Sequence, residues 1–116
     1  MYQSIYAEVL ENSPKTVRAN ERAAILHSIS LLERAQQAGV TSREAVEALL
    51  FLRRLWEFFL VHLASEENRL PEKVRADLIS IGLSVLREVE RVKKGEVQDF
   101  TALKDISQTI ADGLND

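Results

Sequence analysis

Few side chains in this chain could do acid–base, nucleophilic or metal chemistry, and their spacing assembles no site. His27 and His62 fall in different predicted helices, and no glycine-rich elbow presents a serine near either one. His62 and Glu66 are four residues apart and could supply two metal ligands, whereas a zinc site needs three or four. Cysteine is absent, which excludes disulfides and thiolate chemistry. We therefore predict no catalytic residue and no metal site.

The acidic pairs do not change this expectation. Glu66–Glu67 and Glu88 with Glu90 lie on helix flanks with Arg or Lys three or four residues away, as solvated helix faces usually do. No glycine-rich phosphate-binding motif is present either. The sequence predicts a protein that is not an enzyme and that needs no cofactor.

The strongest signal is apolar and lies in residues 43–64, which hold the single Trp and three of the four Phe. At 100° per residue one apolar face forms, and a second apolar line runs beside it. Charged residues are confined to a narrow strip on the rest of the helix surface. The first face contains Ala45, Leu49, Leu52, Trp56, Phe59, Leu60 and Leu63; the second line, called the ridge below, contains Phe51, Leu55 and Phe58; the strip contains Glu47, Arg53, Arg54 and Glu57.

The ridge has two interpretations. Helices at 2–10, 71–94 and 99–113 could bury it jointly, as in an ordinary core. It could instead be a groove that accepts an amphipathic helix from another protein, since exposed aromatic surface of this size usually has a partner. We predict partner binding at Phe51 and Phe58, with Leu55 shared between the core and the groove.

Helices are expected at 2–10, 14–38, 41–68, 71–94 and 99–113, and no segment alternates with the period of a strand. Their limits follow from local signals. Pro14 and Pro71 suit helix starts, Gly39 and Gly95 suit helix ends, and Thr41-Ser42-Arg43-Glu44 matches a capping box. Short connections favour antiparallel neighbours. The prediction is one all-α domain, 1–116, built as a compact bundle of four or five mostly antiparallel helices, with Trp56 as a core anchor.

Composition narrows the partners and the compartment. With 15 Lys and Arg against 18 Asp and Glu, the net charge of −3 argues against a free-standing nucleic-acid or anionic-membrane binder. The longest apolar run without a charge, 58–65, is too short to cross a bilayer. No basic region leads into an apolar segment at the N-terminus, so we expect no signal peptide and a cytoplasmic protein.

Motifs at both ends and in the middle carry a family resemblance. The ENSP of Glu11–Pro14, the alanine-rich segment after it, the LWEFF of Leu55–Phe59 and the DFTALKDISQTIADGL of Asp99–Leu114 occur in this order. In these features the chain resembles the FlaF family of flagellar biosynthesis regulators, over nearly its whole length.

The resemblance implies a small helical cytoplasmic protein needed for flagellin synthesis and filament assembly. It implies flagellin as the partner, in a secretion-chaperone-like role, and a functional link to the regulator FlbT, which lowers flagellin translation. The alternative is regulation of flagellin mRNA translation through RNA or through FlbT. The family brings no catalytic motif to transfer to this sequence.

Overall fold

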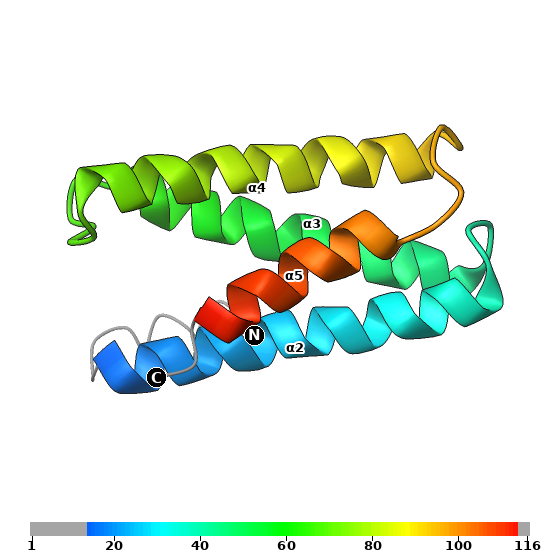
Figure 1. Cartoon of the computed structure of the whole chain (residues 1–116), viewed down its shortest axis with the longest axis horizontal. Helices are drawn as coiled ribbons and strands as arrows, with labels where there is room; N and C mark the ends of the chain where they lie inside the picture. Colours follow the sequence, from blue (N-terminus) through cyan, green and yellow to red (C-terminus); the bar gives the residue numbers. More distant parts are fainter. Residues whose placement is uncertain (1–13, 114–116) are drawn as a thin grey trace.

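The computed structural model describes the backbone of residues 14–113 and the side chains of residues 19–113. This part of the chain forms four helices (Figure 1) and contains no strand: α2 (Pro14–Ala38), α3 (Arg43–Ala64), α4 (Glu72–Lys93) and α5 (Thr101–Gly113). The predicted all-α bundle is confirmed. The helix expected at 2–10 lies outside the described residues.

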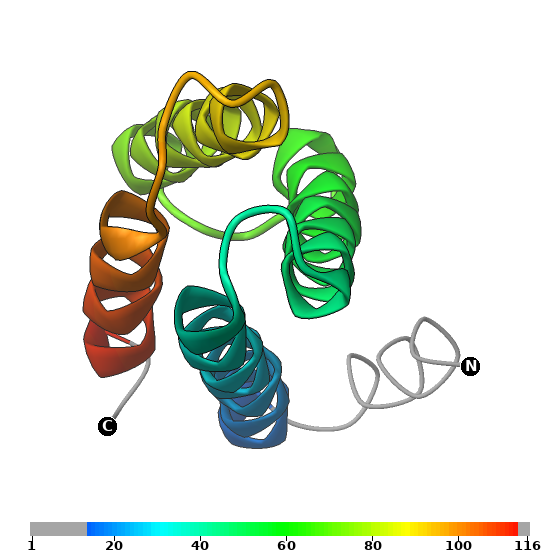
Figure 2. The ribbon, with the colours of Figure 1, turned by 90° about the vertical axis from the view of Figure 1, so that its right-hand side faces the viewer.

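The four helices surround one core, as the view along the bundle shows (Figure 2). Each helix packs on its neighbours in the order α2, α3, α4 and α5, and α5 returns to α2. The contact of α5 with α2 is much more extensive than its contact with α4. The longer helices α2, α3 and α4 therefore make the frame, and α5 is a short helix laid mainly along α2.

The turn between α2 and α3 is fixed by backbone geometry and one hydroxyl. Gly39 has φ +105°, the left-handed region that favours glycine, and its N–H donates to Ala35 O at 2.8 Å. Ser42 Oγ accepts from Ala45 N–H at 3.1 Å and donates to Gly39 O at 2.6 Å. The N-cap is therefore Ser42, and the capping box predicted with Thr41 as its cap is wrong by one residue.

The end of α3 comes four residues earlier than predicted, at Ala64 instead of Asn68. The backbone of Ser65 leaves the helix with ψ 140°, and its N–H donates to His62 O. Asn68 Nδ2 donates to the same carbonyl at 3.0 Å, so a side chain satisfies the orphaned helix end. Arg75 of α4 donates to Ser65 O at 3.4 Å, which ties this turn to the next helix.

The core confirms the inward face predicted for α3. Trp56 is 3% exposed, and Phe59 packs edge-on against it with ring centroids 5.3 Å apart. On α4, Val85, Val89 and Val92 are buried. Val74, near the start of the same helix, is 43% exposed.

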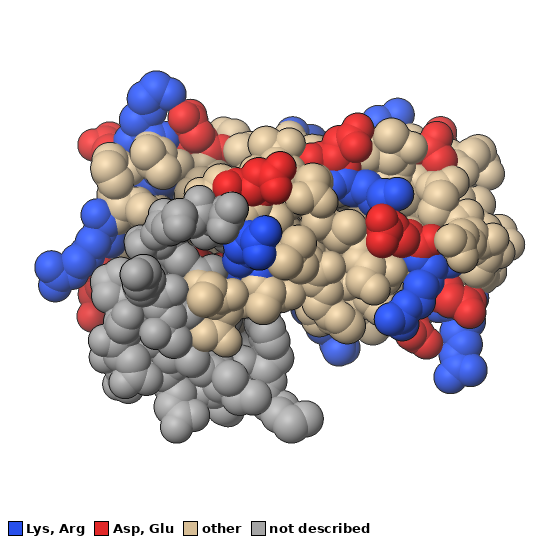
Figure 3. All heavy atoms as spheres, turned by 60° about the horizontal axis from the view of Figure 1, so that its bottom comes forward, with Lys and Arg blue, Asp and Glu red and all other residues tan. Residues whose placement is uncertain are grey.

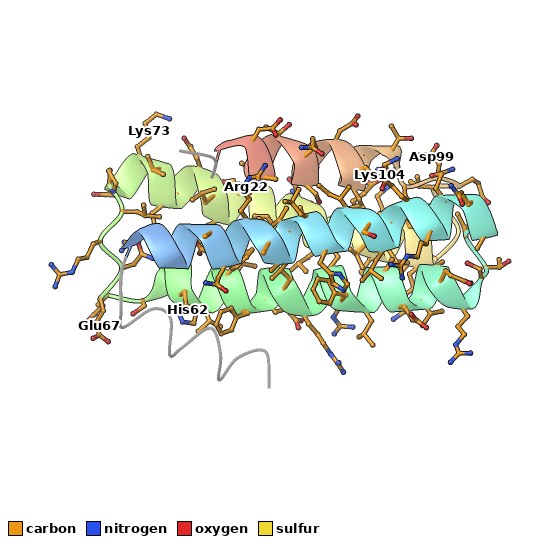
Figure 4. All side chains as sticks on the ribbon, turned by 90° about the horizontal axis from the view of Figure 1, so that it is seen from below. Arg22, His62, Glu67, Lys73, Asp99 and Lys104 are labelled. Atoms are coloured by element: carbon orange, nitrogen blue, oxygen red, sulfur yellow. The ribbon has the colours of Figure 1, made fainter. Side chains whose placement is uncertain are left out.

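The α5 helix is held by its own apolar residues and by polar groups of α2. Phe100 and Leu103 are each 1% exposed. At one end, Phe100 N–H donates to Gln36 Oε1 at 2.9 Å. At the other end, Arg22 Nε donates to Ala111 O at 3.2 Å (Figure 4). Two α2 side chains thus occupy the two ends of an antiparallel helix that would otherwise have unsatisfied backbone groups.

Candidate partner-binding surface

At Phe51 the ridge faces α2. Phe51 meets His27 of α2 edge-on, with ring centroids 4.9 Å apart. Both Phe51 and Phe58 are half-buried and pack against the core cluster. The described ring contact of Phe51 comes from α2, which neither interpretation of the ridge includes, so both interpretations stay open.

Leu55 differs from its two neighbours on the ridge. Its side chain is 2% exposed and belongs to the core cluster. The expectation that Leu55 is shared between core and groove is wrong, because its angular position on α3 lies closer to the buried face than those of Phe51 and Phe58. At 2% exposure Leu55 cannot itself touch a partner while the helices stay together.

The C-terminal part of the ridge continues into His62. The rings of Phe58 and His62 lie with centroids 4.3 Å apart, and those of Phe58 and Phe59 lie 6.5 Å apart. His62 Nδ1 is 3.1 Å from Phe58 O, and since a carbonyl can only accept, Nδ1 carries the proton in this contact. The hydrogen bond fixes the imidazole as a continuation of the aromatic line.

Titratable groups do not converge on a reaction centre in the described part of the chain. Within residues 19–113, no group of three or more His, Asp or Glu side chains is placed to hold a metal ion. Glu66 lies beyond the end of α3, so it does not share a helix face with His62 (Figure 4 shows His62 and the neighbouring Glu67). The buried polar residues of residues 19–113 are Ser28 and Ser107, each 1% exposed.

Several exposed charged residues form ion pairs with an oppositely charged residue of the same helix. On the face seen in Figure 3, Lys and Arg are interspersed with Asp and Glu. The ion pair of Lys73 with Asp77 spans 2.8 Å, and this hydrogen bond raises the pKa of Lys73 above its ordinary value. Arg53 pairs with Glu57 in the same i, i+4 geometry on α3. Because both pairs are exposed, they contribute little to stability.

Residues 2–114 match the model of the family described as Flagellar protein FlaF. The chain belongs to the FlaF family. No curated protein and no solved structure matches it. The match includes all four described helices and the whole ridge, so this is a flagellar protein. In the described part of this FlaF-family chain, no helix combines the length and the apolar character that a bilayer span requires.

One surface of this FlaF-family protein was missed by sequence reasoning. Leu83 on α4 is 47% exposed, and Leu86 beside it is half-buried. They line an open hollow of about 460 Å³. The sequence signal was available, because Ile79, Leu83 and Leu86 follow helical spacing outside the stripe of inward valines. The aromatic residues of residues 43–64 give a stronger apolar signal.

Proposed function

We propose that this FlaF-family protein is a non-enzymatic regulator of flagellum biosynthesis that binds flagellin and promotes its synthesis or export and filament assembly. The observation that carries the proposal is the family match over residues 2–114. The helical bundle is consistent with it, because a chaperone-like protein for a helical export substrate needs apolar helix surface on a stable frame. We place this action in the cytoplasm, where flagellin is made.

The contact would be made by the aromatic residues of the ridge. Phe51 and Phe58 are half-buried, and each packs on a histidine ring, whereas Leu55 between them in the sequence is buried. Partly exposed aromatic rings on a rigid element are frequent anchors of protein interfaces. Burial of one terminal amphipathic helix of flagellin beside these rings would keep that segment from self-associating before export.

The test compares flagellin affinity with protein stability. Phe51→Ala and Phe58→Ala should keep most of the melting temperature and raise the Kd for full-length flagellin about 30-fold, the effect of losing an anchor worth about 2 kcal/mol. Val61→Ala is the matched control, since Val61 is 70% exposed on the same helix and lies off the ridge. Flagellins truncated at either end identify the bound segment. A wild-type protein that binds no flagellin refutes the proposal.

Ionic strength separates this mechanism from control of flagellin mRNA translation. Binding through phosphate contacts weakens steeply as salt rises, whereas burial of apolar surface does not. We expect flagellin binding to change little between low and physiological salt, and no binding of flagellin mRNA. A steep salt dependence together with mRNA binding would favour translational control through RNA. Binding of FlbT alone would favour translational control through that regulator.

A further inference from the structure

The outer face of α4 carries a surface that the bundle does not use. Val85, Val89 and Val92 point inward and are buried, whereas Leu83 on the other side is 47% exposed. The α5 helix lies mainly along α2 and leaves this face open. The hollow of about 460 Å³, called the α4 hollow below, is lined by Leu83, Leu86, Arg87, Glu90, Arg91, Lys94 and Glu96.

Charge around the α4 hollow is unevenly compensated. Arg91 is engaged by Glu88 at 3.0 Å and by Glu96 at 3.9 Å. Arg87 donates only to the uncharged Ser84 Oγ, at 3.2 Å, in the described set of hydrogen bonds. Neither Arg87 nor Lys94 forms an ion pair within residues 19–113. The α4 hollow therefore combines two apolar residues, Leu83 and Leu86, with two cations, Arg87 and Lys94. Neither cation is paired with a carboxylate within residues 19–113.

We infer that the α4 hollow docks an acidic amphipathic helix of a partner protein. Arg87 and Lys94 are seven residues apart, or about 10 Å along the α4 axis. An apolar stripe on the incoming helix covers Leu83 and Leu86, and carboxylates about two turns apart face the two cations. This surface lies on a different helix from the ridge, so the inference does not depend on where flagellin binds.

Other occupants fit the same residues less well. A second copy docked through the same hollow would bring a lining of three cations and two carboxylates against an equal one, which leaves net positive charge unmatched. Nucleic acid would find no aromatic ring in the lining on which a base could stack, and its phosphates would leave the apolar residues uncovered. Because the hollow combines apolar residues with unpaired cations, a helix that is both acidic and partly apolar fits it best.

The experiment uses the full chain, labelled for nuclear magnetic resonance, and two synthetic helical peptides. Both peptides carry the same leucine stripe, flanked by glutamates in one and by lysines in the other. The glutamate peptide should shift the amide signals of residues 83–96, and the lysine peptide should not. Leu83→Gln should weaken binding about tenfold through lost apolar burial, and Arg87→Glu about fivefold.

Two variants serve as matched controls. Leu70→Gln changes a leucine of similar exposure, 43%, in the connection before α4. Arg54→Glu reverses an exposed arginine on α3. Both should bind the glutamate peptide as the wild type does. Circular dichroism verifies that every variant is folded, which is expected because Leu83 is almost half exposed.

Several results would overturn the inference. They are equal binding of the two peptides, unchanged affinity in Leu83→Gln, or shifts confined to residues 51–62. Concentration-dependent shifts at residues 83–96 without peptide, with a doubled sedimentation mass, would assign the hollow to a second copy. Tighter binding of a polyuridine strand at the same residues would assign it to RNA.

Discussion

Gly82 of α4 lies directly against side chains of α3. A Cβ added there would lie 2.9 Å from Leu60 Cδ2 and 2.9 Å from Trp56 Cε3. Leu60 is half-buried and can rotate away. The indole cannot, because Trp56 is 3% exposed and is held edge-on by Phe59. We therefore predict that Gly82→Ala destabilises the protein, although alanine is the better helix former.

The magnitude follows from two opposing effects. Replacing glycine by alanine inside a helix normally stabilises by about 1 kcal/mol. Forcing an extra methyl group into a packed core destabilises by about 1–3 kcal/mol. The expected net loss is about 1 kcal/mol, which would lower the melting temperature by about 4 °C for a chain of this size. Gly82→Val, which adds two further methyl groups, should lose more.

Urea unfolding followed by circular dichroism measures the change in unfolding free energy, and fluorescence measures the change around Trp56. Trp56 is the single Trp of the chain, so a shift in its emission reports directly on the contact. Ala76→Gly, at an exposed position of α4, calibrates helix propensity in the same helix. In a Leu60→Ala background, Gly82→Ala should destabilise less, because two of its three close contacts are gone. A stabilised Gly82→Ala with unchanged Trp56 emission would refute the reasoning.

Three further predictions concern the core and α5. Trp56→Ala should lose about 3–5 kcal/mol of the roughly 5–15 kcal/mol that a domain has, and a melting temperature that barely moves would place Trp56 outside the core. The α5 helix has 13 residues and lies mainly along α2, so hydrogen exchange should show weaker amide protection there than in α3, and equal protection would contradict this. Ser107 Oγ is buried without a hydrogen-bond partner, so Ser107→Ala should leave unfolding free energy unchanged or raise it by up to about 1 kcal/mol, and a clear loss would show a missed hydrogen bond.

The ridge shows why a helical pattern identifies a candidate surface but does not determine which of its residues are exposed. Spacing alone places Phe51, Leu55 and Phe58 along one side of the helix. Whether that side faces water depends on the position of α2, whose His27 meets Phe51. A few tens of degrees around the helix axis separate Leu55, which is buried, from Phe58, which is half-buried. The sequence could not resolve this difference, because it depends on the crossing of two helices.

Local chemistry was enough to predict the helical class, the inward position of Trp56 and the glycine turns after α2 and α4. Gly39 and Gly95 both have positive φ, and only the intrinsic freedom of glycine is needed to explain them. The buried valines of α4, Val85, Val89 and Val92, also follow helical spacing, since residues that share a helix face do so whatever the rest of the chain does.

Tertiary structure decided the features that depend on a neighbour. The α3 helix ends at Ala64 because Asn68 and Arg75 bind the turn that follows it, although the residues after Ala64 could have continued the helix. Leu83 is exposed because α5 lies along α2 and not over the outer face of α4. Gly82 matters because Trp56 lies against it. In each case the deciding contact joins residues of different elements, and helical periodicity carries no information about which face another element will cover.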